Sequence, residues 1–275
     1  AAAMLCGAAG IPLSLGYCRE NPYSLLTDWL PEREPDGGVR HEVQRQLDLV
    51  ASIGCHTADT RLSFSVPRHA LDWAQHKACS LGIDPADAWI LIHPGASAAS
   101  RRYPPELWAQ AAQRMAREQR CPILFAGSAD EAALVESIRA ALPAPSWSLC
   151  GELDLARLAA VIALAPVLVC NNSGPAHIAA ATGTAVVDLY ALTNPQHTPW
   201  QVAHRVLFQD VPCRFCYRSV CPQGHHACLR GVDPAAVAQA AGALLVGREG
   251  DTERFAPTLT INQILDAPVR AATPR

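Results

Sequence analysis

The middle of the chain alternates short, mainly apolar runs with segments of helical spacing. The apolar runs cover residues 88–92, 122–126, 146–149, 167–170 and 185–189. Between the first two, apolar positions recur three and four residues apart, as at Leu107, Ala111 and Met115. Strands that are apolar at successive positions are typical of a parallel sheet covered by helices on both faces. The pattern predicts an α/β fold built on a doubly wound parallel sheet.

Local signals mark where the helices of this segment begin. Prolines are tolerated in a first helical turn, and they open the segments at 104–106 and 174–175. Ser128 and Glu131 have the spacing of a capping box before a helix to about residue 142. Asp154 predicts the N-cap of a helix through residue 164, and Asp233 begins an Ala-rich helix that ends near residue 246.

The first 84 residues carry a weaker pattern. We expect strands at 13–17 and 61–66, helices at 39–53 and 67–81, and a polar loop at 32–38. Residues 248–275 are a polar tail, in which we expect a short helix at 261–265. We therefore divide the chain into an N-terminal domain (1–84), a C-terminal domain (85–247) and a tail (248–275).

Composition narrows the class of protein. Half of the 275 residues are apolar, which excludes disorder along the whole chain, yet no apolar run reaches the ~18 residues of a membrane span. The net charge of −3 argues against a nucleic-acid partner. The chain has 11 scattered cysteines and lacks a signal peptide at residues 1–9, so we expect a cytoplasmic protein.

Candidate chemistry lies in the loops that follow three predicted strands. In a doubly wound sheet, ligands bind beyond the carboxyl ends of the strands. After the strand at 167–170, Asn172, Ser173 and Gly174 precede a helix that carries His177 in its first turn. Helix-start amides and the helix dipole favour an anion, and His177 could add a donor. The alternative is an ordinary helix cap with an incidental histidine.

Two other loops point to the same edge. Ser97 and Arg101 follow the strand at 88–92 and could bind a diphosphate, although solvated side chains in a strand–helix loop are as consistent with the pattern. Glu131 follows the strand at 122–126, and its carboxylate could accept hydrogen bonds from a ribose, or simply complete the capping box.

A cysteine cluster follows these loops. Its members are Cys213, Cys216, Cys221 and Cys228, with His225 and His226 between the last two. Four thiolates suffice for a tetrahedral structural zinc, although the spacing is not a standard two-pair pattern. A reduced cysteine loop and a disulfide are the alternatives.

Taken together and in this order, these motifs resemble glycosyltransferase family 9, the lipopolysaccharide heptosyltransferases. The motifs that carry the resemblance are HPGAS at 93–97, R-x-Y-P at 101–104, G-x3-E at 127–131, NSGPxH at 172–177, the cysteine-rich stretch and DPxxV at 233–237. The match is strong from residue 90 to 246 and weak before it.

The resemblance implies a GT-B enzyme, in which two Rossmann-like domains face a cleft and the C-terminal one binds a nucleotide sugar. It implies inverting transfer of a heptose, with ADP-heptose as donor and a lipopolysaccharide core or other glycan as acceptor, and no metal at the donor. By position, Ser97 and Arg101 would bind the diphosphate and Glu131 the ribose. The phosphates and the sugar would contact Asn172, Ser173, Gly174 and His177.

The sequence departs from the family pattern at three places. Asn172 stands where many members have Asp, and Arg101 where a lysine is usual. The glycine–aspartate loop that carries the family's proposed catalytic base has no counterpart before residue 13. We therefore expect an N-terminally truncated chain and identify no catalytic base.

Two alternatives to a transferase remain open, namely a donor-binding fragment without transferase activity and a nucleotide-sugar epimerase of similar fold. Any association with the cytoplasmic face of the inner membrane would come through a lipid-linked acceptor.

Overall fold

The computed structural model describes residues 2–247 except for residues 22, 33–38 and 144. The described chain forms two compact units that divide between Thr60 and Arg61. We refer to the residues up to 60 as unit 1 and to those from 61 onward as unit 2. The expected tail helix at 261–265 lies outside the described residues. No helix in the described ranges has the length and apolar character to cross a membrane.

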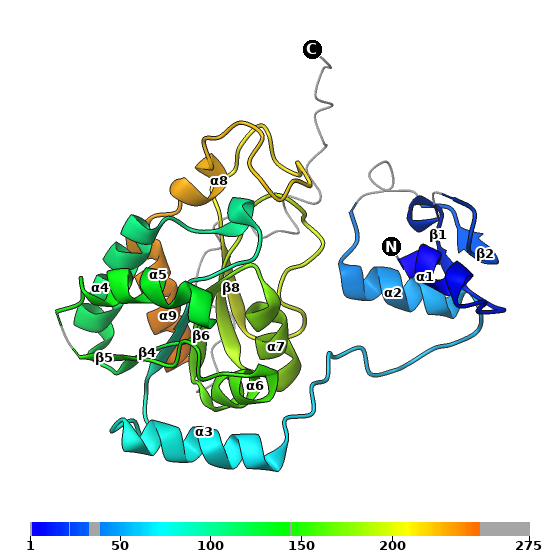
Figure 1. Cartoon of the computed structure of the whole chain (residues 1–275). Helices are drawn as coiled ribbons and strands as arrows, with labels where there is room; N and C mark the ends of the chain where they lie inside the picture. Colours follow the sequence, from blue (N-terminus) through cyan, green and yellow to red (C-terminus); the bar gives the residue numbers. More distant parts are fainter. Residues whose placement is uncertain (1, 22, 33–38, 144, 248–275) are drawn as a thin grey trace. The chain divides into compact units, whose positions relative to one another are not determined.

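Unit 2 is built on a six-stranded parallel sheet (Figure 1). Its strands are β3 (Ile90–His93), β4 (Ile123–Phe125), β5 (Ser146–Ser148), β6 (Val167–Asn171), β7 (Ala185–Leu189) and β8 (His204–Leu207). Their order in the sheet is β5-β4-β3-β6-β7-β8. The chain therefore reverses direction across the sheet between β3 and β6, as in a doubly wound fold. Five of the six strands were predicted from the sequence; β8 was not.

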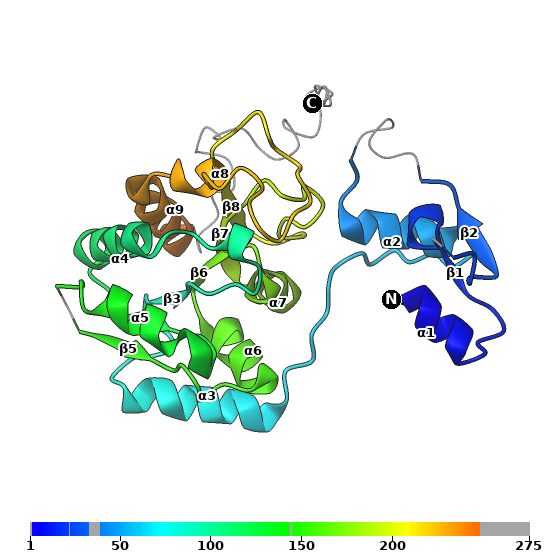
Figure 2. The same ribbon diagram turned by 45° about the horizontal axis from the view of Figure 1, so that its top comes forward.

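Helices cover both faces of this sheet (Figures 1 and 2). One face packs against α4 (Pro105–Gln119), α5 (Ala132–Arg139) and α9 (Pro234–Val246). The other packs against α3 (Arg68–Ser80), α6 (Leu155–Leu164) and α7 (Gly174–Thr182). Along β3, Ile90 and Ile92 contribute to the first core and Leu91 to the second. Burial on both sides explains why the strands are apolar at successive positions.

The expected helix starts are confirmed. The Asp154 carboxylate accepts a hydrogen bond from the Arg157 amide at 2.8 Å, and Asp233 caps α9 through the Ala235 amide at 2.8 Å. The helix predicted to end near residue 142 is shorter: it begins as a 3-10 turn, η3 (Ala129–Glu131), and continues as α5 to Arg139.

The division between the units differs from the expected boundary at residue 84, because α3 belongs to unit 2. The helix buries Ala70, Ala74 and Ala78 in the core that α6 and α7 share. The strand predicted at 61–66 is wrong, since these residues adopt no regular structure and have no sheet partner among the described residues. Phe64 and Val66 instead pack against the same core as α3, which accounts for the alternating pattern.

Unit 1 contains a two-stranded parallel sheet, β1 (Leu15–Tyr17) paired with β2 (Asp28–Leu30). Its helices are α1 (Ala2–Ala8), the 3-10 turn η1 (Cys18–Glu20) and α2 (Glu42–Ala51). The sequence predicted β1 and α2 but not α1 or β2. A three-residue strand carries too little periodicity to be recognised without its partner.

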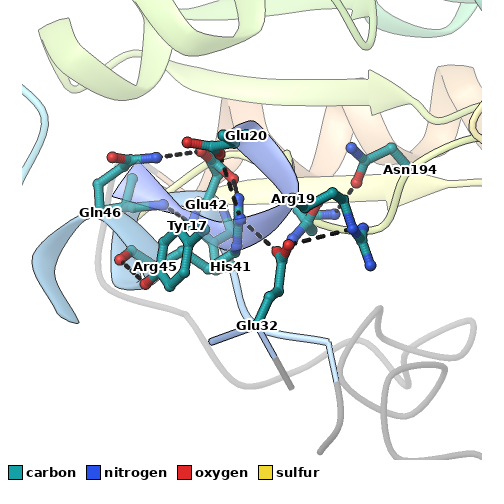
Figure 3. A network of polar contacts seen from close by, with 11 residues as sticks. Tyr17, Arg19, Glu20, Glu32, His41, Glu42, Arg45, Gln46 and Asn194 are labelled. Atoms are coloured by element: carbon teal, nitrogen blue, oxygen red, sulfur yellow. Dashed lines mark hydrogen bonds and ion pairs between the residues drawn. The ribbon is translucent and has the colours of Figure 1, made fainter. Parts of the chain in front are cut away.

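Buried Arg45 organises the polar side of unit 1 (Figure 3). Its Nη2 lies 2.6 Å from Glu32 Oε1, and its Nη1 lies 2.5 Å from Glu42 Oε2. The guanidinium also stacks 4.7 Å from the centre of the Tyr17 ring, whose hydroxyl donates to the Arg45 carbonyl at 2.6 Å. Because only 8% of Arg45 is exposed, these carboxylates offset the cost of burying its charge.

Candidate functional site

The loops after β3 and β6 are joined by Asn171, the last residue of β6. The side-chain nitrogen of Asn171 (Nδ2) donates to the Pro94 carbonyl at 2.6 Å and lies 3.3 Å from the Gly95 carbonyl. Its side-chain oxygen accepts from the Tyr103 amide at 3.1 Å. These two loops therefore form one rigid edge at the point where the strand order reverses, the usual ligand position in such sheets. The sequence analysis did not select Asn171; the polar residue directly ending an apolar strand was the available signal.

Glu131 lies where the loops after β3 and β4 meet. Its Oε2 accepts a hydrogen bond from the Ser128 amide at 2.8 Å, and the reciprocal bond completes a capping box. The cap predicted for Glu131 is therefore present. The carboxylate also packs directly against Gly95. A Cβ atom at position 95 would lie only 1.6 Å from Glu131 Oε1, which is too close for any side chain. Glycine at position 95 thus makes room for the acid.

Glu131 faces a buried histidine at the end of β3. His93 Nε2 lies 3.9 Å from Glu131 Oε2, and His93 Nδ1 is buried without a partner among the described residues. Burial lowers the pKa of His93, against the charge of Glu131, which raises it. His93 is accordingly neutral at pH 7 and does not pair with Glu131 as a cation.

The two arginines after β3 have different environments. Arg102 holds the loop together, since its Nε donates to the Ala96 carbonyl at 2.7 Å. Arg101 ends the 3-10 turn η2 (Ala99–Arg101) and is partly exposed, and its side chain forms no ion pair or hydrogen bond with the described residues. Its charge is close enough to lower the pKa of Asp188. Ser97 is exposed on the same loop. Arg101 is thus a cation that can accept an anionic partner.

The start of α7 is open. Its N-cap, Ser173, makes no side-chain cap bond within the described chain, and Ser173 Oγ instead donates to the Asn171 carbonyl at 3.1 Å. Gly174 is exposed, and a Cβ built on it would meet no described atom within 4 Å. His177 follows in the first turn, with its ring 6.2 Å from that of His197 and nearly perpendicular to it. Pro175 has no amide hydrogen, and the Ala176 amide donates to the Ser173 carbonyl at 3.0 Å. Of residues 174–176, Gly174 therefore has the amide that no described residue accepts from, and an amide at a helix start suits an anion.

Asn172 is buried beneath this helix start and contacts an acid that the sequence analysis missed. The side-chain nitrogen of Asn172 (Nδ2) donates to the His197 carbonyl at 2.9 Å and lies 3.3 Å from Asp188 Oδ2. Asp188 is fully buried on β7. Burial raises its pKa to about 8, against the Asn172 hydrogen bond and the Arg101 charge, which lower it. The single acid inside the apolar run at 185–189 was the signal in the sequence.

The seven predicted binding residues thus lie on the loops, 3-10 turns and helix start that follow β3, β4 and β6 of unit 2. They are Ser97, Arg101, Glu131, Asn172, Ser173, Gly174 and His177. The convergence that the strand pattern predicted is present, and Asn171 gives it a direct structural basis. Which of these residues contacts a ligand remains a prediction.

The cysteine cluster lines one pocket. Cys213, Cys216, Cys221 and Cys228 surround it with both His225 and His226. All four cysteines are free, and Cys213 Sγ lies 3.8 Å from His225 Nε2. Within the described chain, however, no three His, Cys, Asp or Glu side chains are grouped as a metal ion requires. This arrangement does not provide a preformed zinc site, so the structural zinc stays a prediction from spacing.

The cysteine-rich segment, residues 213–228, is hydrogen-bonded to the loop after β3. The Ser100 amide donates to the Ser219 carbonyl at 3.0 Å, and Ser100 Oγ donates to the Arg218 carbonyl at 2.8 Å. Ser100 directly precedes Arg101, so this segment supports the turn that carries the unpaired cation.

Comparisons with known proteins identify the relatives of the chain. A family model described as "Glycosyltransferase family 9 (heptosyltransferase)" matches residues 1–227. Lipopolysaccharide heptosyltransferase 2 of Escherichia coli strain K12 is 30% identical over 257 residues, covering 88% of this chain and 71% of that protein. The chain spans about half the length of other curated relatives that it matches.

Two solved structures share the fold. The glycosyl transferase family 9 protein from Veillonella parvula DSM 2008 has a TM-score of 0.75 at 22% identity, over 89% of this chain and 70% of that one. The E. coli ADP-heptose lps heptosyltransferase II has a TM-score of 0.67 at 23% identity, over 90% of this chain and 74% of that one. They confirm the expected α/β, GT-B-like fold class.

Proposed function

Since the chain belongs to glycosyltransferase family 9, we propose that it takes part in the inverting transfer of a heptose from ADP-heptose to a lipopolysaccharide core. Unit 2 would bind the donor. The name of the E. coli relative of similar fold, an ADP-heptose lps heptosyltransferase, supports this choice of donor and acceptor. The acceptor is lipid-linked, so contact of this cytoplasmic enzyme with a membrane would come through it.

One observation carries the proposal. Arg101 has no ionic partner among the described residues, and it lies on the edge where α7 begins with exposed Gly174. A guanidinium and the Gly174 amide, at a helix start beside a strand-order reversal, together suit a diphosphate. In this proposal Ser97 assists Arg101, and Glu131 accepts from the ribose with its free carboxylate oxygen. Asn172, Ser173, Gly174 and His177 contact the phosphates and the sugar.

The proposed chemistry is a single displacement at the anomeric carbon. The acceptor oxygen forms the new bond while the bond from that carbon to the diphosphate oxygen breaks, and ADP leaves with the electron pair. Arg101 and the Gly174 amide stabilise the charge that develops on the leaving group. We propose that this cationic set makes a donor-bound metal unnecessary. The acceptor proton passes to a general base that the set does not include.

Calorimetric titration tests the proposal. We expect ADP-heptose and ADP to bind unit 2 of the full chain, and UDP-glucose to bind more weakly. Incubation with heptose-deficient lipopolysaccharide then measures transfer. Binding without transfer would favour a donor-binding chain, and epimerised free ADP-sugar without acceptor would favour an epimerase. If no nucleotide or nucleotide sugar binds, the proposal is wrong.

We expect His177→Ala to weaken ADP-heptose binding about tenfold, because a donor hydrogen bond to a charged group contributes about 1.5 kcal/mol. Calorimetry of the variant and of His76→Ala, an exposed histidine on α3, measures the difference. Equal affinity of His177→Ala and the unaltered chain would remove His177 from the site.

Two glycine variants distinguish effects on stability from effects on donor binding. In Gly174→Ala the new methyl group enters open space, so the thermal midpoint should stay within a degree or two while ADP-heptose affinity falls about tenfold. In Gly95→Ala the methyl group would overlap the Glu131 carboxylate. That carboxylate must swing away, so stability falls by about 1 kcal/mol with the lost cap, and affinity falls with the lost ribose contact.

Differential scanning calorimetry and titration give both quantities for each glycine variant. Gly95→Ala combined with Glu131→Ala should lose no more affinity than Glu131→Ala alone, since both changes remove the same carboxylate. Unchanged affinity in Gly174→Ala would place the donor away from the start of α7.

A further inference from the structure

Asp188 is a buried acid that contacts Asn172, just before the start of α7. It follows Val186 by two positions on β7, so it faces the sheet surface that α6 and α7 cover. It is 0% exposed; its Oδ2 lies 3.3 Å from the Asn172 amide nitrogen, and its Oδ1 has no partner among the described residues. A buried acid with an unsatisfied oxygen costs stability, which suggests a role in the site.

The contact with Asp188 fixes the orientation of Asn172. The Asn172 nitrogen faces two oxygens, those of Asp188 and of the His197 carbonyl, so both of its hydrogens are used. The Asn172 side-chain oxygen can then only accept, and it accepts from no described residue. Only 4% of Asn172 is exposed. Asp188 and the His197 carbonyl thus hold Asn172 as an acceptor for a hydroxyl group of a ligand.

The surroundings of Asp188 contain one permanent cation. Arg101 lowers the pKa of Asp188, while burial raises it to about 8. Cys170 on β6 and Tyr190 after β7 also face Asp188, and burial raises the pKa of each, so both remain neutral. On β8 the residue opposite is Val206. Asn172 itself donates to the carbonyl of His197, whose ring lies 6.2 Å from that of His177 on α7.

We propose that Asp188 is a positioning residue of the donor site, which orients Asn172 and takes up a proton when an anionic nucleotide-sugar donor binds. The inference rests on the proposed function. A diphosphate that pairs with Arg101 cancels the charge that favours ionised Asp188, and it adds negative charge nearby. Neutral Asp188 is therefore the form that admits the donor.

The test is calorimetric titration of the full chain with ADP-heptose from pH 7 to pH 9, in two buffers of different ionisation enthalpy. The donor diphosphate does not titrate in this range. With a pKa of about 8, the neutral fraction of Asp188 falls about tenfold between these pH values, so affinity should fall about tenfold. At pH 9 the unaltered chain should take up close to one proton for each donor bound.

Two variants complete the test. Asp188→Asn should bind ADP-heptose with an affinity that changes less than twofold over this range and without proton uptake. Asp72→Asn, an exposed acid on α3, should behave like the unaltered chain. The proton count on the unaltered chain needs no variant, so it decides the matter even if Asp188→Asn does not fold.

Exchange of the two residues tests the contact itself. Asn172→Asp places a second carboxyl group beside Asp188, and it should weaken ADP-heptose binding at pH 8 at least tenfold. The double variant Asn172→Asp, Asp188→Asn should recover affinity to within about threefold of the original. Binding without proton uptake at pH 9, or an Asp188→Asn variant with the original pH profile, overturns this inference alone. Failure of ADP-heptose to bind at pH 7 overturns the proposed function as well.

Discussion

Replacement of Arg101 by Ala is expected to weaken ADP-heptose binding about a hundredfold. The Arg101 guanidinium makes no hydrogen bond or ion pair with the described residues, whereas Arg102 Nε donates to the Ala96 carbonyl. A guanidinium that makes charge-assisted hydrogen bonds to a diphosphate contributes about 3 kcal/mol, which corresponds to that loss. Calorimetric titration at pH 7 measures it.

Two further substitutions make this prediction specific. Arg101→Lys should keep most of the affinity, because it keeps the charge and matches the residue usual in the family at this position. Arg117→Ala removes an exposed arginine from α4 and should have no effect. If Arg101→Ala binds ADP-heptose as the unaltered chain does, the diphosphate does not lie at η2.

The second large effect concerns stability. The pKa of Asp188 is about 8 in the folded chain, against an ordinary value of 3.8. The folded state therefore holds a proton that the unfolded state has lost. The contribution of neutral Asp188 is fully present below about pH 4 and is lost as pH rises to about 8. The slope is about 1.4 kcal/mol per pH unit, or about 4 kcal/mol between pH 5 and pH 8.

Urea unfolding at pH 5 and pH 8 measures this loss. Asp188→Asn does not titrate, so its unfolding free energy relative to the original chain should increase by several kcal/mol between the two pH values. Asp72→Asn provides the matched control, since Asp72 is half exposed and pairs with Arg68 on the same helix. A constant difference between Asp188→Asn and the unaltered chain would mean that Asp188 is already ionised at pH 5.

Sequence pattern was sufficient for the four central strands of unit 2, β3, β4, β6 and β7, because these are buried on both faces. Val167 and Val169 pack on one side and Leu168 on the other, so apolar residues at every position mark the strand. β8 escaped prediction because it carries His204 and Arg205 and is partly exposed at the sheet edge. The alternating pattern at 61–66 predicted a strand that is not there. Phe64 and Val66 are partly buried against the core, but these residues have no sheet partner among the described residues.

The candidate site was predictable to the extent that its residues lie next to apolar strands. Glu131 was recognised from its capping-box spacing, but only the structure shows that its carboxylate fills the space over Gly95. Asn171 and Asp188 act through residues distant in sequence, at Pro94 and Asn172. Such contacts depend on strand order, which a single sequence does not encode locally. Likewise, only the structure shows that the Arg101 side chain has no partner among the described residues.

The central claim is that the nucleotide-sugar donor binds at the loops after β3 and β6 of unit 2. Amide hydrogen–deuterium exchange with and without saturating ADP-heptose tests it most directly. We predict slower exchange at residues 95–101 and 174–178, since the diphosphate would accept from the Gly174 amide and shield the first turn of α7. Protection confined to other segments, with these two unchanged, would contradict the claim.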